Sequence, residues 1–312
     1  PLEIGSDIGG SLRVPASFCG VFSHKPTWGM VTQRGHVPPA PGIPIEPDLN
    51  VVGPIARSAR DLRLLLGVLD GRPSKAKAVP TQGLRVALWV DDPAFTVDAE
   101  VRAAIEAFGA RLEEAGAVVE PVTPLDSRAL FDAYIVLLLS LLGADLPAST
   151  RAGFRALRPA ALAARKLGAG SLSWAAATVA YTATHRDWLA AEAARGAMQQ
   201  QMARLFERYD IVLAPVNPVV AFPHDHKPFM RRKLVCSGGQ KIPYTTMLQW
   251  ISLATALKLP ATAVPAGPNN TGLPVGAQLI GPHGEDERLL AIAEGIEAAL
   301  GGLYVPPPPT TL

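Results

Sequence analysis

In some segments of this chain hydrophobic residues recur at helical spacing, and in other segments they recur at strand spacing. Ser58 stands three residues before Asp61 and just ahead of a leucine-rich run, residues 62–69, which Gly71 follows. A capping side chain, apolar residues at helical spacing and a closing glycine together predict an amphipathic helix. Strands are predicted at residues 84–90, 117–122, 210–215 and 273–281, and further helices at residues 98–115 and 286–300. This alternation of strands and helices favours an α/β fold.

Proline and glycine are unusually frequent in this chain. They supply 30 and 28 of the 312 residues, whereas average proteins contain about 5% and 7%. They gather at residues 5–54, 214–228 and 259–276, which are predicted to be rich in turns, and the first stretch is not expected to hold long regular elements. Residues 125–209 are rich in alanine and predict helices with breaks at Pro147, Pro159 and residues 168–170. No internal repeat or clear linker interrupts this order, so a single domain over residues 1–312 is expected.

Composition and charge exclude several classes of protein. Lys and Arg number 29 against 27 Asp and Glu, and a net charge of +2 is too small to predict nucleic-acid binding. Charged residues make up only 18% and hydrophobic residues 48%, which predicts a large core. The uncharged runs 133–144 and 242–257 are shorter than the roughly 20 residues of a membrane helix, so no membrane span is expected. With two cysteines and no visible export signal, we expect a cytoplasmic protein.

The segment from Gly5 to Arg13 carries the most informative chemistry. It reads Gly-Ser-Asp-Ile-Gly-Gly-Ser-Leu-Arg. Two glycines before a serine allow consecutive backbone N–H groups to point at one spot, as an oxyanion site requires, with the Ser11 hydroxyl placed to attack the same carbonyl carbon. A Gly-Gly-Ser sequence is more often a plain turn, so the residues alone leave both interpretations open.

This segment resembles the second half of the signature of the amidase signature family of serine hydrolases. Further matches follow in the family's order and spacing. They are Phe18-Cys-Gly20, Lys25-Pro-Thr27, Gly53-Pro-Ile-Ala-Arg57 before Asp61-Leu62, Leu273-Pro-Val-Gly276 and Gln278-Leu-Ile-Gly281. The resemblance covers essentially the whole chain but only the carboxy-terminal two thirds or so of the usual family domain. We therefore expect the chain to be incomplete at its amino-terminal end.

The resemblance implies a role for each residue of the segment. Ser11 matches the family's nucleophile, which forms an acyl-enzyme. Ser6 matches a hydroxyl that supports the catalytic network, and Asp7 and Arg13 match charged residues that are mainly structural. A buried aspartate and arginine flanking a loop would pair bidentately and hold its shape. The oxyanion-hole residues implied by the resemblance are Ile8, Gly9, Gly10 and Ser11.

The resemblance also implies a lysine base that acts through a bridging serine in a Gly-Ser-Ser-Gly-Gly loop, and neither precedes Ser11 in this sequence. A serine hydroxyl is a poor nucleophile until a neighbour removes its proton. Lys25 is the nearest lysine, but the family gives it no catalytic part, and a surface or backbone-bonding role is expected. A pair of Ser11 with His24 or His36 is a further alternative that spacing neither favours nor excludes.

Two other patterns have competing interpretations. His224-Asp-His226 offers two imidazoles and a carboxylate, but it lies in a proline-rich stretch without a clear third or fourth ligand, so a metal site is disfavoured. Met247, Trp250 and Leu253 recur at a spacing of three and share one helix face. Core packing is the stronger interpretation of that face, and a part of the wall of an acyl pocket is the alternative.

These observations lead to one functional hypothesis with two alternatives. We expect an α/β/α sandwich around a large mixed β-sheet that hydrolyses a small-molecule amide without a cofactor or metal. The alternatives are the glutamine-hydrolysing subunit of a tRNA-dependent amidotransferase and an inactive fragment of the family. A homodimer, or a second chain that supplies the missing amino-terminal part, is the expected partner.

Overall fold

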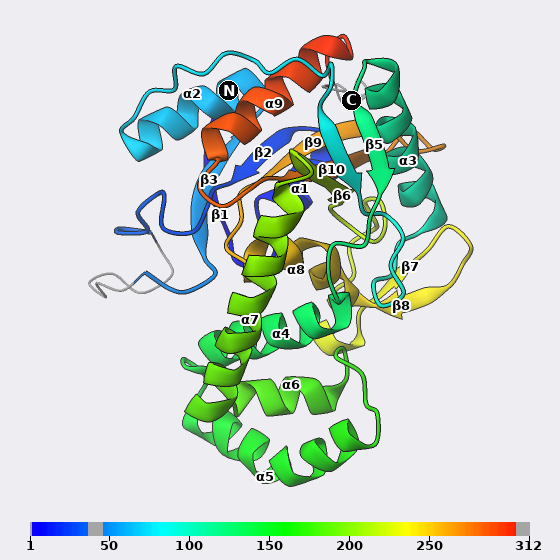
Figure 1. The fold of residues 1–312 in the computed structure, drawn as a ribbon. Helices are drawn as coiled ribbons and strands as arrows, with labels where there is room; N and C mark the ends of the chain where they lie inside the picture. Colours follow the sequence, from blue (N-terminus) through cyan, green and yellow to red (C-terminus); the bar gives the residue numbers. More distant parts are fainter. Residues whose placement is uncertain (1, 37–45, 304–312) are drawn as a thin grey trace.

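The computed structural model describes residues 2–36 and 46–303, and its centre is a mixed eight-stranded sheet (Figure 1). The strand order is β1-β3-β2-β9-β10-β6-β4-β5. Strand β4 runs parallel to both β5 and β6, and the remaining pairs are antiparallel. The strands are β1 (Glu3–Asp7), β2 (Phe22–Lys25), β3 (Val51–Ala56), β4 (Arg85–Leu88), β5 (Val118–Pro121), β6 (Ile211–Pro215), β9 (Ala261–Pro268) and β10 (Pro274–Ile280). A separate two-stranded sheet joins β7 (Lys233–Val235) to β8 (Lys241–Pro243).

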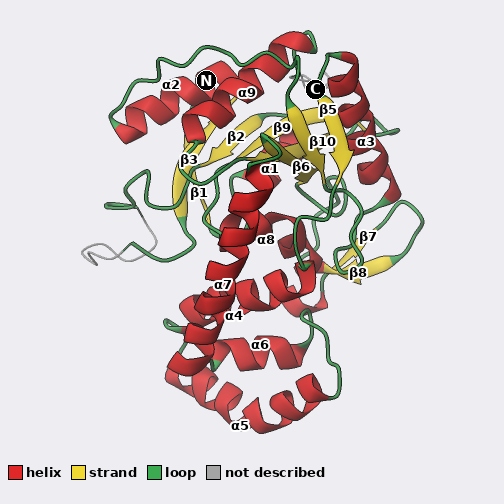
Figure 2. Ribbon diagram, in the orientation of Figure 1, coloured by secondary structure: helices red, strands yellow, loops and turns green. Residues whose placement is uncertain are grey.

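Helices cover both faces of the large sheet (Figure 2). One face packs against α2 (Ala59–Asp70), α3 (Ala99–Glu114) and α9 (Asp286–Ala299), and the other against α1 (Arg13–Cys19), α4 (Ser127–Gly143) and α8 (Leu248–Ala256). Strand β6 shows why both faces of the sheet need to be covered. Its Val212 and Ala214 belong to one apolar cluster, and its Ile211 and Leu213 belong to the other. Alternate side chains of a strand point to opposite faces. The predicted α/β/α sandwich around a mixed sheet is confirmed.

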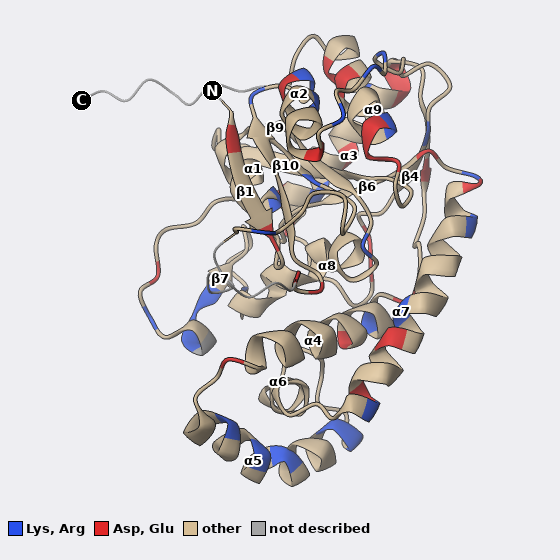
Figure 3. Cartoon of the chain, turned by 90° about the vertical axis from the view of Figure 1, so that its left-hand side faces the viewer, with Lys and Arg blue, Asp and Glu red and all other residues tan. Residues whose placement is uncertain are grey.

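A helical extension projects from the second face. Helix α4 contacts α6 (Trp174–Tyr181) and α7 (His185–Phe206), and α5 (Ala148–Lys166) packs on α6 at the far end from the sheet (Figure 1). Two 3-10 turns, η1 (Phe229–Arg231) and η2 (Tyr244–Met247), flank the small sheet. Figure 3 shows Lys and Arg along α5, and residues of both charges along α7 and α9. Within the described residues, none of the helices combines the length and apolar character needed to cross a membrane.

Local sequence signals placed several elements correctly. The Ser58 hydroxyl accepts a hydrogen bond from the Asp61 N–H at 3.1 Å and begins α2, and Gly71 ends it at φ +71°. Gly116 follows α3 at φ +90°. The strands expected at residues 84–90, 117–122, 210–215 and 273–281 are β4, β5, β6 and β10.

Two predictions about proline were wrong. Pro159 lies inside α5 rather than interrupting it. Proline has no backbone N–H, so the carbonyl of Arg155, one turn earlier, loses its helical hydrogen bond. Both Pro159 and Arg155 are exposed, so water can replace that hydrogen bond. The turn-rich stretch 259–276 contains β9, an eight-residue strand. Pro265 is tolerated there because it lies at a register shift in the pairing with β10. In the first turn-rich stretch the elements are short, and residues 37–45 of it lie outside the described residues.

Candidate active site

Ser11 lies in the short connection between β1 and α1. Strand β1 ends at Asp7 and α1 begins at Arg13, so five residues turn the chain from sheet to helix. Gly10 makes the turn possible with φ +93°. A Cβ atom there would lie 2.8 Å from Val14 Cγ2 and 3.2 Å from Ile251 Cγ2. Residue 10 therefore has to be a glycine both for its backbone angle and for lack of space.

Asp7 and Arg13 close this loop with a fully buried ion pair. Arg13 Nε donates to Asp7 Oδ2 at 3.0 Å and Nη2 donates to Oδ1 at 3.1 Å, while both side chains have 0% exposure. The same carboxylate accepts hydrogen bonds from the N–H groups of Gly10, at 2.8 Å, and Leu12, at 3.3 Å. The expected bidentate pair is present, and it holds the loop at four points.

Arg13 also anchors the loop to the sheet and to α8. Its Nη1 donates to the Ile251 carbonyl at 3.1 Å and to Gln278 Oε1 at 3.0 Å, and its Nη2 donates to Thr255 Oγ1 at 2.6 Å. The Gln278 amide in turn donates to the carbonyls of Pro215 and Trp250. The sequence did not predict that Gln278 would hold Arg13 in place, although Gln278 belongs to one of the segments that resemble the family.

Electrostatics keep the Asp7 carboxyl ionised. Burial alone would raise its pKa, but the charge and hydrogen bonds of Arg13, the charge of Lys25 and the Gly10 N–H together hold the pKa of Asp7 below its usual value. A carboxylate is a stronger acceptor than a neutral acid, so the ionised form fixes the loop more firmly.

Lys25 is the last residue of β2, and its side chain is fully buried. Its Nζ donates to the Pro26 carbonyl at 2.9 Å. Burial and the charge of Arg13 lower the pKa of Lys25 to about 7, while the charges of Asp7 and Asp286 oppose that change. The expected backbone-bonding role is confirmed and the surface alternative was wrong, because β2 lies inside the sheet between β3 and β9.

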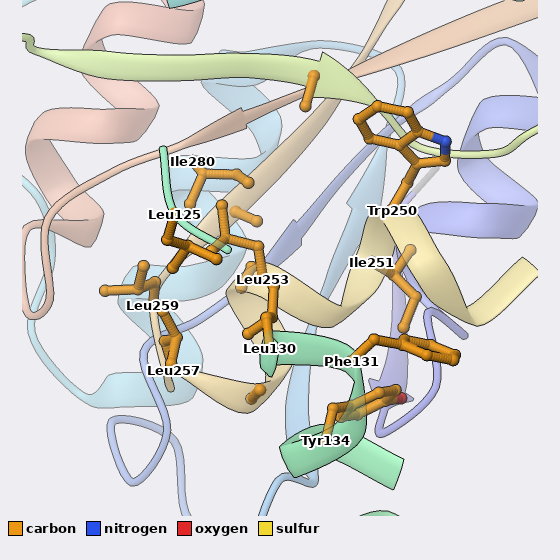
Figure 4. Close-up of a cluster of buried hydrophobic side chains, with 14 of the residues drawn as sticks. Leu125, Leu130, Phe131, Tyr134, Trp250, Ile251, Leu253, Leu257, Leu259 and Ile280 are labelled. Carbon is orange, nitrogen blue, oxygen red and sulfur yellow. The ribbon is translucent and has the colours of Figure 1, made fainter. Parts of the chain in front are cut away.

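Helix α4 supports the loop from the other side. The Tyr134 hydroxyl donates to the Ile8 carbonyl at 3.0 Å. Burial raises the pKa of Tyr134, so the hydroxyl stays a neutral donor. Figure 4 shows Tyr134 and Phe131 of α4 beside Ile251 of α8, the residue that packs on Gly10. The loop is thus held between β1, α8 and α4, and no sequence signal had indicated Tyr134.

The N–H groups expected to form an oxyanion hole are not equivalent. Gly10 N–H already donates to Asp7, as described above. Among the described residues, none accepts a hydrogen bond from the backbone N–H of Ile8, Gly9 or Ser11. Ser6 lies earlier, in β1, opposite Val52 of β3. Three N–H groups around Ser11 therefore have donor capacity to spare within the described part of the chain.

The Ser11 side chain is exposed and borders two cavities. One has about 460 Å³ and lies beside β1, against Leu2, Gly5 and Ile55. The other has about 350 Å³ and lies between the loop and residues 229–248. A small molecule could reach the hydroxyl from either side.

The histidines do not pair with Ser11. His24 is fully buried, with Nδ1 at 2.9 Å from Thr262 Oγ1 and Nε2 at 3.0 Å from Asp286 Oδ1. Among the described residues, no hydrogen bond joins Ser11 to His24, His36 or Lys25. The proton acceptor for Ser11 is therefore not one of these three side chains in this arrangement.

The two remaining sequence patterns have different outcomes. Met247 lines the 350 Å³ cavity, whereas Trp250 and Leu253 are 0% exposed in the main core. Met247 is also buried, at 7% exposure, in a smaller apolar cluster, so all three residues pack in apolar cores and Met247 borders the cavity as well. The rings of His224 and His226 are 6.3 Å apart. No group of three or more His, Cys, Asp or Glu that could hold a metal occurs in the part of the chain that the structure describes.

Comparisons with known proteins identify relatives of this chain. A family model described as Amidase matches residues 1–290. The chain is 30% identical over 326 residues to a glutamyl-tRNA(Gln) amidotransferase subunit of Macrococcus caseolyticus, covering 95% of this chain and 64% of that protein. A crystal structure of an amidase matches with a TM-score of 0.71 and 25% identity, covering 95% of this chain and 62% of the other. A bacterial aryl acylamidase of the amidase signature enzymes shares the fold, with a TM-score of 0.69 and 22% identity, covering 97% of this chain and 64% of the other. The chain thus spans a little under two thirds of the length of these proteins.

Proposed function

Since this chain belongs to the amidase family, we propose that it carries the nucleophile of an enzyme that hydrolyses carboxylic amide bonds. The observation that carries the proposal is the exposed Ser11 hydroxyl, next to N–H groups with spare donor capacity on a loop that a buried ion pair holds in place. Preorganised donors of this kind stabilise an oxyanion without reorganising during the reaction.

The proposed reaction has two halves. Ser11 Oγ attacks the amide carbonyl carbon, and the N–H groups of Ile8, Gly9 and Ser11 stabilise the negative charge on the carbonyl oxygen. The carbon–nitrogen bond then breaks, the amine leaves with a proton, and an ester to Ser11 remains. Water hydrolyses that ester and restores the hydroxyl. We leave Gly10 out of the donor set, because its N–H serves Asp7.

The proposal assigns the proton acceptor to polypeptide other than these 312 residues. The family pattern uses a neutral lysine and a bridging serine for this step, and the side chains around Ser11 described above include neither. An upstream segment or a second chain would deliver both from the side of the 460 Å³ cavity, where β1 is the outermost strand of the sheet. We place the protein in the cytoplasm, which is consistent with the free thiols of Cys19 and Cys236.

A fluorophosphonate probe tests the nucleophile directly, because it forms a covalent bond with an activated serine. With the polypeptide that supplies the proton acceptor present, we expect labelling that disappears in Ser11→Ala and persists in Ser149→Ala. Ser149 is a matched control, since it is also exposed and also near the start of a helix. Undiminished labelling of Ser11→Ala would exclude Ser11. Absence of labelling in correctly folded protein, with that polypeptide present, would favour the inactive fragment.

A second candidate is the glutamine-hydrolysing subunit of a tRNA-dependent amidotransferase. The relative of Macrococcus caseolyticus described above belongs to such an amidotransferase by name and is 30% identical. Glutaminase activity that increases when partner subunits are added would support this candidate. Turnover of simple amides without partner subunits would support the first.

A further inference from the structure

Four aromatic rings lead from α1 to the cavity beside Ser11. Phe18 of α1 meets Phe222 edge to face, with ring centroids 5.7 Å apart and an angle of 86° between the rings. Phe222 meets Tyr244 at 6.0 Å and 87°, and Tyr244 meets Phe229 at 5.4 Å and 81°. Each contact has the perpendicular geometry that aromatic pairs prefer.

The last two rings of this row face open space. Tyr244 and Phe229 both line the 350 Å³ cavity, together with Gly9, Ser11 and Leu248. Phe229 is 50% exposed, so part of its ring surface is open to a ligand. A cavity of about 150 Å³ accommodates benzene. The larger volume here therefore suits an aromatic ring with a short link to a carbonyl group at Ser11.

The cavity offers no charged side chain as a partner to a charged ligand. Among the described residues that form its walls, none is Asp, Glu, Lys, Arg or His. The nearby Arg232 guanidinium lies over the Tyr244 ring at 5.8 Å and donates from Nε to the Lys227 carbonyl, outside the lining. Removing an ammonium group from water is costly where no acidic side chain can pair with it, so this space disfavours a zwitterion such as glutamine.

The wall is coupled to the nucleophile through α1. Val14 and Phe18 lie one helical turn apart and both pack against a small apolar cluster formed by Val219, Leu234, Cys236, Ile242 and Met247. Since α1 begins two residues after Ser11, this cluster sets the position of the aromatic wall relative to the hydroxyl.

From these contacts we propose that the 350 Å³ cavity is the subsite for a neutral aryl group, and that Phe229 and Tyr244 select amides with an aromatic ring near the carbonyl. The incoming ring extends the aromatic row by one more edge-to-face contact with Phe229. This inference rests on the proposed function only in taking Ser11 as the position of the reacting carbonyl.

Binding to the Ser11→Ala variant tests the inference without depending on turnover. We expect phenylacetamide, followed by NMR titration, to bind at least about tenfold more tightly than acetamide. Phe229→Ala in the same background should weaken phenylacetamide binding by about three- to tenfold, as expected for the loss of one aromatic contact. Phe154→Ala should leave binding unchanged, because Phe154 stacks on Tyr181 at the α5–α6 contact. Thermal melts of both variants verify that each is folded.

The possible results separate the two proposals. Equal affinity for phenylacetamide and acetamide, an equal effect of Phe229→Ala and Phe154→Ala, or competition by glutamine would overturn the aryl subsite, whatever the probe shows at Ser11. Selective aryl binding without fluorophosphonate labelling of the wild-type protein, when the polypeptide that supplies the proton acceptor is present, would overturn the nucleophile and leave the subsite standing.

Discussion

Replacing Asp7 with asparagine should destabilise the protein strongly. The substitution keeps the size of the side chain but removes the charge that Arg13 meets, in a place where both groups are inaccessible to water. Asparagine also turns an N–H group toward one of the two guanidinium nitrogens that now donate to Asp7. Leaving one member of a buried pair uncompensated costs about 3–5 kcal/mol. We expect a loss of that size in the free energy of unfolding of Asp7→Asn.

Urea unfolding followed by circular dichroism measures this loss, and the chain contains a matched control. Asp70 also accepts two hydrogen bonds from an arginine, Arg72, whose side chain is 75% exposed. Pairs in that setting contribute about 0–1 kcal/mol, so Asp70→Asn should have little effect. The double variant Asp7→Asn with Arg13→Met should be less destabilised than the sum of the two single variants, because neither charge is left alone.

The fall of the unfolding free energy at acid pH gives a second measurement of the role of Asp7. The folded-state pKa of Asp7 is lowered, so its contribution is complete above the unfolded-state pKa and is lost as pH falls through the folded-state pKa. Asp7→Asn should therefore flatten the fall in stability below about pH 4. Equal unfolding free energies for Asp7→Asn and Asp70→Asn, or strict additivity in the double variant, would refute the assigned role of the pair.

Two further predictions concern the same region. Gly10→Ala should lower the unfolding free energy by about 1–3 kcal/mol and abolish probe labelling, because strain at φ +93° adds to the clash with Val14. Gly29→Ala, at φ +84° with open space around it, carries only the backbone cost, and an equal loss in both would contradict the packing argument. For Lys25, the folded-state pKa of about 7 means that the unfolded state binds the extra proton between about pH 7 and pH 10, so stability should rise with pH by up to about 1.4 kcal/mol per pH unit. Urea titrations at about pH 7 and pH 9 should show this rise in the wild type and not in Lys25→Met, and parallel changes in the two would count against it.

The sequence predicted those parts of the fold that local signals determine. Helix α2 has a capping serine and a closing glycine within the chain itself, and both ends were placed correctly. Strand β9 was missed because proline normally marks turns, and only the pairing with β10 shows that Pro265 lies at a register shift. Pro159 was misjudged for a related reason, since solvent exposure, which a sequence does not state, decides whether a helix tolerates proline.

The candidate site likewise contains residues that local sequence signals predict and residues that only the folded chain brings together. The Asp7–Arg13 pair could be predicted, because both residues flank one loop in a short motif. Tyr134 and Gln278 could not, because they approach the loop from residues more than a hundred positions away and serve it through single hydrogen bonds. The aromatic wall was missed because Phe229 and Tyr244 become neighbours only when η1 and η2 fold around the small sheet.

The small apolar cluster around β7 and β8 has a consequence for how this protein can change. It is distinct from the two large clusters that enclose the sheet, although Val14 packs against this cluster and against one of the large ones, and Ser237 between β7 and β8 hydrogen-bonds to Asp98 at the start of α3. Substitutions among its own residues therefore act first on the cavity wall and on α1, and less directly on the sheet. New ligand preferences can arise here with less disturbance of the sheet than substitutions in the large clusters would cause.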